Sequence, residues 1–143
     1  MHSEHLKNVS APAVLIGWLV SVGVAVLLVF LLTAVGWMSE EDSSTLWAIV
    51  AVAIGFFVGG YVTGTRDIEA PILHGIGIGL TTLVAWFVLN ALATFIDRTA
   101  YSGLSATATA GLLLVQMIAA VAGAWLADRR ALRGEDLTRE PLG

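Results

Sequence analysis

Four long apolar segments follow one another along the chain, separated by short polar stretches. They cover residues 12–37, 45–65, 71–96 and 104–127. A helix needs about 20 mainly apolar residues to cross a ~30 Å hydrocarbon core, so each segment is long enough to span a membrane. The pattern predicts an all-α integral membrane protein: one domain of four transmembrane helices in an antiparallel bundle, then a short polar cytoplasmic tail at 128–143.

Composition supports a membrane location and narrows the chemistry. Of the 143 residues, 57% are hydrophobic and 13% are charged, whereas soluble domains average about 25% charged residues. The four segments leave no room within this sequence for a separate catalytic domain. Cysteine is absent, which excludes disulfides, thiolate nucleophiles and sulfur-based metal sites.

The basic residues predict the orientation, because cytoplasmic loops of membrane proteins carry an excess of Lys and Arg. Arg98 alone falls on the side of the first and third connections. The other six basic residues fall on the side of the two termini: Lys7, Arg66, Arg129, Arg130, Arg133 and Arg139. We therefore expect a multi-pass protein with its N- and C-termini in the cytoplasm.

Small residues recur at four-residue spacing, which places them on one helix face and lets two backbones approach closely. The rows predict helix packing within the bundle, and an interface with a second copy or another membrane protein is the alternative. Their members are Gly55, Gly59, Gly60, Gly64, Gly75, Gly79, Ala119, Gly123 and Ala127.

A weak internal repeat relates the two halves of the chain. Residues 58–66, at the end of the second segment, align with residues 121–129 at the end of the fourth, pairing Gly60 with Gly123. The alignment is compatible with two parallel-repeat hairpins. The alternative is that any closely packed span ending at the cytoplasm shows small residues followed by arginine.

His74 is the titratable group nearest to a span that invites a functional hypothesis, because imidazole changes its charge near neutral pH. It lies about one helical turn from Pro71, so we expect it to contact headgroups and water. A hydrogen bond to Thr63, to Thr65 or to the end of the second segment is the favoured role, and proton transfer is the alternative.

Three further polar groups lie within the apolar segments: Trp86, Asn90 and Gln116. Trp86 falls near the middle of the third segment, where its indole N–H needs an acceptor from a neighbouring helix or protein. Asn90 and Thr109 are at similar depth and are expected to pair, while Gln116 lies nearer mid-bilayer. Hydrogen bonding between helices is the predicted role, and a substrate pocket is the alternative.

The central hairpin resembles a family of small bacterial four-span membrane proteins of unknown function. The resemblance rests on a Gly-Gly-x-x-x-Gly helix end at 59–64 and a Leu-His-Gly motif at 73–75, followed by two further glycines. The turn departs from the family pattern, because Arg66 is followed by Asp67 and Glu69. The resemblance implies a four-span fold in the bacterial inner membrane and no particular chemistry.

The sequence therefore favours a noncatalytic subunit or scaffold that packs with other integral membrane proteins, or with itself, in a larger inner-membrane complex. An oligomeric small transporter or channel is the alternative, and an enzyme is the least favoured class. We expect membrane lipids as neighbours, no nucleic-acid partner, no cofactor and no metal. His2, Glu4 and His5 are interpreted as solvated, because an exposed arm lacks the enclosure of a metal site.

Overall fold

The described residues form four α-helices. The computed structural model describes residues 9–38, 41–66, 70–96 and 106–138. The helices are α1 (Ala11–Ala34), α2 (Glu41–Arg66), α3 (Pro71–Ile96) and α4 (Ala106–Thr138). Each is long and apolar enough to cross a membrane. The prediction of an all-α, multi-pass bundle of four helices is confirmed, whereas the expectations for His2, Glu4, His5, Lys7, Asp67, Glu69, Arg98 and Arg139 concern residues outside the described ones.

α1 ends earlier than hydropathy predicted, because Gly36 adopts a left-handed conformation with φ +84°. The N–H of Gly36 donates to the Thr33 carbonyl and the N–H of Trp37 donates to the Leu32 carbonyl, both at 3.0 Å. This Schellman pattern satisfies carbonyls that the helix end would leave unpaired. The Trp37 ring then packs on Trp47 of α2, with 5.0 Å between ring centroids.

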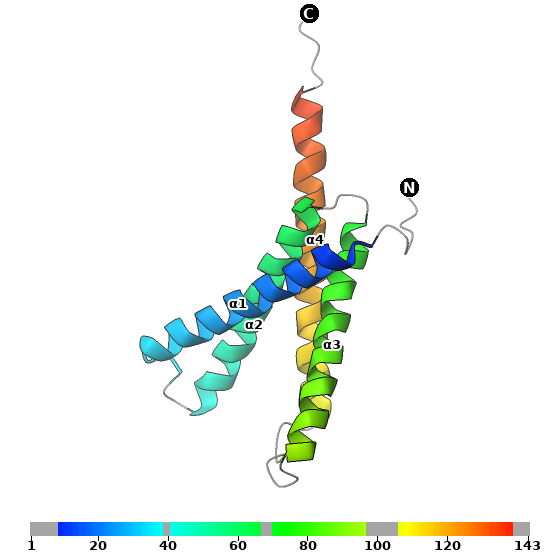
Figure 1. The fold of residues 1–143 in the computed structure, drawn as a ribbon. Helices are drawn as coiled ribbons and strands as arrows, with labels where there is room; N and C mark the ends of the chain where they lie inside the picture. Colours follow the sequence, from blue (N-terminus) through cyan, green and yellow to red (C-terminus); the bar gives the residue numbers. More distant parts are fainter. Residues whose placement is uncertain (1–8, 39–40, 67–69, 97–105, 139–143) are drawn as a thin grey trace, which may run out of the picture.

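α4 continues well beyond the predicted end of its span. Residues 128–138, expected to form part of a polar tail, extend the same helix to Thr138. The stretch 129–133 contains only Arg, Ala and Leu, which are among the strongest helix formers. Figure 1 shows this last part of α4 projecting past the other three helices.

The helices form two hairpins that meet at one end. We call this the termini end, where α1 and α3 begin and α2 and α4 end, and we call the opposite end the far end. α2 packs extensively against both α1 and α4, and α3 packs mainly against α4. Toward the far end, the α1–α2 hairpin diverges from the α3–α4 hairpin, as Figure 1 shows.

Burial follows this arrangement. Among the described residues, α1 has no buried residue beyond Ala25 and α3 has none beyond Gly79. The far-end parts of the same helices expose large side chains to the surroundings, including Phe30 and Phe87, each 67% exposed, and Phe95 at 95%. Tight packing is therefore concentrated toward the termini end.

Candidate functional site

The α1–α2 contact is made through backbone and very small side chains. A Cβ atom added at Gly55 would lie 2.6 Å from the Ser21 carbonyl oxygen. One added at Gly59 would overlap the Ser21 hydroxyl and the Gly17 carbonyl oxygen. No side chain fits at Gly55 or Gly59, so the row of small residues that these two form lies against α1.

The partner row on α1 was missed by the sequence analysis. Ala13, Gly17, Ser21 and Ala25 lie four residues apart, and all four are buried. The Ser21 hydroxyl donates to the Gly17 carbonyl at 2.8 Å, which satisfies it without a partner from another helix. The spacing that identified the α2 rows was present in α1 as well, but serine and alanine made it less conspicuous than a row of glycines.

The second row of α2 lies against α4. A Cβ at Gly64 would lie 2.7 Å from the Ala124 carbonyl oxygen, and one at Gly60 would overlap the backbone of Ala120. In return, a Cβ at Gly123 would overlap the Phe57 carbonyl oxygen. Gly60 and Gly64 meet successive turns of α4 in the same order along the chain, so the two helices run parallel.

α3 packs on α4 through two of its glycines. A Cβ at Gly75 would lie 2.7 Å from the Val121 Cα, and one at Gly79 would lie 2.9 Å from the Met117 Cγ. Since the numbering rises along α3 as it falls along α4, this pair is antiparallel. The predicted glycine face of the third span is the face that α4 covers.

The α4 row differs by one position from the row that the sequence analysis named. Ala127 is 2% exposed and its Cβ faces Gly64. Ala119, in contrast, is only half-buried, while the neighbouring Ala120 is fully buried. α4 is covered by α2 on one side and α3 on another, so its buried face is wider than a single four-residue row.

His74 is fully buried, so the expectation that it contacts headgroups and water is wrong. Its Nε2 accepts a hydrogen bond from the Ser10 N–H at 3.0 Å. Its Nδ1 lies 2.7 Å from the Ala70 carbonyl oxygen, to which it donates as the neutral ring. The start of α1 crosses over α3 here, so the ring satisfies an N–H that the helix itself leaves free.

Trp18 and Gln116 are the deeper polar groups of the packed half. The Trp18 indole Nε1–H donates to the Thr82 hydroxyl at 3.1 Å and so ties α1 to α3. Gln116 is 7% exposed, and within the described residues its Oε1 atom is buried with no hydrogen-bond partner. The carbonyl end of the Gln116 amide is thus unsatisfied within the described residues.

Asn90 and Trp86 form no link to another helix in the described part of the chain. The Asn90 amide donates to the Trp86 carbonyl of its own helix at 2.7 Å, so its expected pairing with Thr109 is wrong. Asn90 lies on the part of α3 toward the far end, where the two hairpins diverge, whereas Thr109 is buried. Trp86 is 38% exposed, and its indole N–H has no hydrogen-bond acceptor among the described residues.

Across the described segments, no three His, Cys, Asp or Glu side chains lie close enough together to hold a metal ion. Comparisons with family models, curated proteins and solved structures found no match to this chain. The function must therefore be argued from the packed core and from the polar groups on the exposed faces.

Proposed function

We propose that this chain is a noncatalytic membrane subunit or scaffold that packs with partner proteins in a larger complex of the bacterial inner membrane. Both termini would lie in the cytoplasm, as the basic residues indicate. The resemblance of the central hairpin to small four-span bacterial proteins supports the same location. We expect the partners to be integral membrane proteins.

The observation that carries the proposal is the Trp86 indole N–H, which meets no hydrogen-bond acceptor among the described residues. Trp86 lies near the middle of α3, and the side chains around it on the exposed face are large and apolar, including Leu83 at 47% and Phe87 at 67% exposed. Hydrocarbon offers no hydrogen-bond acceptor, so a polar group at this depth is satisfied only by protein. A partner helix lying along this face would supply the acceptor.

Asn90 and Thr94 extend the polar part of the same face by one and two turns. Their side chains already bond to the α3 backbone, at 2.7 Å for Asn90 and 2.9 Å for Thr94. Each retains an oxygen that can accept a further hydrogen bond. Apolar contact with a few polar groups is typical of helix association in membranes.

The test is native mass measurement after gentle detergent extraction, on the wild type and on a Trp86→Phe, Asn90→Leu double variant. The wild type should give a stoichiometric complex larger than the chain alone. Two lost interhelical hydrogen bonds, at about 0.6–1.7 kcal/mol each, should lower the affinity for the partner by a factor of roughly 7 to 300. Helix content should stay unchanged, because these groups bind no other helix of this chain.

A matched control is Trp125→Phe, which removes another exposed indole N–H but at the termini end. It should leave the complex intact. A lone monomer, or a pure homo-oligomer of the wild type, would contradict the proposal. Equal loss of the partner from Trp125→Phe would contradict the assignment of the α3 face.

One observation keeps an oligomeric transporter or channel as a second proposal. Within the described residues, the buried Oε1 of Gln116 has no hydrogen-bond partner, and a solute or a second copy would supply one. If so, Gln116→Leu should abolish flux in reconstituted vesicles. Unchanged flux would remove the main support for that function.

A further inference from the structure

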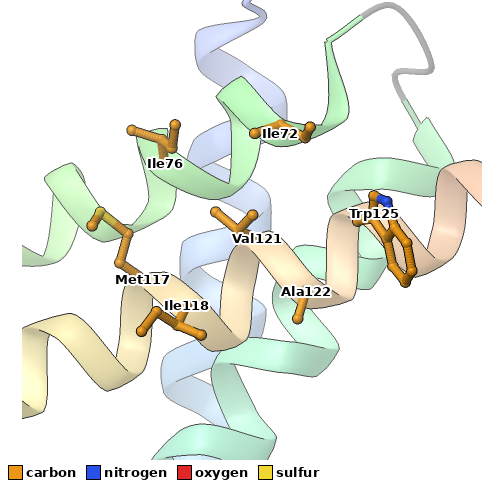
Figure 2. A pocket seen from close by; sticks show the side chains of 7 residues that line it. All are labelled: Ile72, Ile76, Met117, Ile118, Val121, Ala122 and Trp125. Carbon is orange, nitrogen blue, oxygen red and sulfur yellow. The ribbon is translucent and has the colours of Figure 1, made fainter.

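A groove runs between α3 and α4 on the outside of the bundle, near the termini end. Its walls are entirely apolar side chains, and it has a volume of about 380 Å³. Figure 2 shows Ile72 and Ile76 of α3 on one side, Met117, Ile118 and Val121 of α4 on the other, and Trp125 at one end. An apolar groove facing outward suits an acyl chain.

Basic side chains continue the same face of α4 beyond the groove. Ile118, Ala122, Trp125, Arg129 and Arg133 follow one another at three- or four-residue spacing, and all are exposed. The face is therefore apolar along the groove and cationic after it. This is the order of groups along a phospholipid, from chain to phosphate.

The length of this face agrees with one leaflet. Ile118 and Arg129 are separated by eleven residues, which is about 16 Å along a helix at 1.5 Å per residue. Half of the hydrocarbon core is about 15 Å thick. When Ile118 lies near the bilayer midplane, Arg129 lies at the level of the phosphates.

Arg129 and Trp125 both carry hydrogen-bond donors that meet no acceptor among the described residues. The Arg129 guanidinium carbon lies 3.9 Å from the centroid of the Trp125 ring, which holds it above the groove. Within the described residues, neither its N–H groups nor the Trp125 indole N–H meets an acceptor. An exposed phosphate could accept from both.

The neighbouring charged residues do not compete for the same position. Arg130 points to α2, with its Nη1 at 3.4 Å from the Tyr61 hydroxyl and its guanidinium over the Tyr61 ring. Asp128 is half-buried and forms no ion pair with Arg129 among the described residues. Among the described residues, Arg129 and Arg133 are thus the cations that continue the exposed face of α4 beyond the groove.

We propose that the α3–α4 groove binds one acyl chain of an anionic phospholipid, whose phosphate is bound by Arg129, Arg133 and the Trp125 indole N–H. A headgroup with net negative charge is favoured, because a zwitterionic headgroup brings its own cation to the two arginines. The groove lies nearer the termini end than Trp86 does, and none of its lining residues belongs to the face formed by Trp86, Asn90 and Thr94.

The experiment is a lipid titration of the full chain in detergent, followed by native mass spectrometry, with phosphatidylglycerol and phosphatidylcholine compared at equal acyl composition. The affinity for the first bound lipid should be at least about tenfold higher for phosphatidylglycerol than for phosphatidylcholine. Each arginine near an anionic headgroup contributes roughly a fivefold change in affinity. The double variant Arg129→Gln, Arg133→Gln should therefore have the same affinity for phosphatidylglycerol as for phosphatidylcholine.

Two matched controls separate the site from general charge and from other occupants. Arg130→Gln removes a neighbouring charge that faces Tyr61 and should change the preference less than twofold. Ala122→Trp fills the groove and should weaken both lipids, whereas Ala91→Trp, on an exposed part of α3 nearer the far end, should weaken neither. Melting temperatures of all variants identify any that fail to fold.

Three results would overturn the proposal. One is an equal loss of preference from Arg130→Gln and from Arg129→Gln, which would indicate general attraction alone. Another is an unchanged preference in the double arginine variant. The third is an Ala122→Trp variant that binds lipid normally but changes its oligomeric state, because the groove would then be covered by a second copy or a partner helix.

Discussion

The two halves of this molecule are both built from apolar helices, but they pack very differently. Toward the termini end, glycines of α2, α3 and α4 lie so close to a neighbouring backbone that no Cβ atom fits. In contrast, Gly111 near the far end and Gly23 on an exposed face of α1 have no atom within 4 Å of the position of an added Cβ. The comparison teaches that a glycine brings membrane helices together only where another small residue faces it.

The reason is physical. Lipid tails are as apolar as leucine, so apolar composition alone gives two membrane helices no tendency to associate. Close approach depends on dispersion contacts between backbones, which require small residues on both helices. The α1 row from Ala13 to Ala25 lies against α2, whereas α1 separates from the α3–α4 hairpin toward the far end.

The largest expected effect comes from filling the closest contact. In Gly60→Leu, the new side chain would collide with the Ala120 backbone, which cannot move without separating α2 from α4. We expect a loss of about 3 kcal/mol in the free energy of unfolding, measured by denaturant titration in micelles. Gly111→Leu, at an open position, should change it by less than about 1 kcal/mol; similar losses at both sites would refute the distinction between the halves.

Substitution of His74 tests whether helix packing at the termini end depends on more than small residues. His74→Ala removes the acceptor for the Ser10 N–H and the donor to the Ala70 carbonyl. Leaving a buried backbone N–H unpaired should cost about 1–3 kcal/mol. Hydrogen exchange at the Ser10 amide should accelerate in the same variant.

His74→Gln is the matched control, since its side-chain oxygen keeps an acceptor near the position of Nε2. It should retain most of the stability and most of the protection at Ser10. If His74→Ala were as stable and as protected as the wild type, the contact between α1 and α3 would not depend on this ring.

The sequence predicted the helices more fully than their contacts. Hydropathy depends on residues along one helix, so the number of spans and their approximate limits followed directly. His74 was placed by counting turns along α3, which takes no account of the start of α1 crossing above it. Ala119 was chosen over Ala120 because a four-residue row does not show that two different helices cover α4. The divergence of the hairpins was not predictable from hydropathy, since lipid and protein cover apolar residues equally well.

Substitution of two tryptophans tests the difference between the two halves with a smaller expected change in stability. Trp18→Phe removes the hydrogen bond to Thr82 and should lower the free energy of unfolding by about 0.6–1.7 kcal/mol. Trp86→Phe makes the same chemical change on the splayed part of α3, where the indole has no acceptor within the described residues. It should leave the stability of the isolated chain unchanged. Equal losses would mean that Trp86 has a partner inside this chain.

Substitution of Gln116 has the smallest expected effect. Its side chain is buried, like the groups of the packed half. Its Oε1 has no hydrogen-bond partner among the described residues, like the Trp86 indole N–H. In Gln116→Met, a side chain of similar length replaces an amide whose Oε1 has no partner within the described residues. Removing an unpaired buried acceptor is neutral or stabilising, so the free energy of unfolding should stay the same or rise by about 1 kcal/mol at most. A loss of 1 kcal/mol or more in the isolated chain would show that the amide already stabilises the bundle. It would then belong with the small residues that hold α2 against α4, and the transporter proposal would lose its free acceptor.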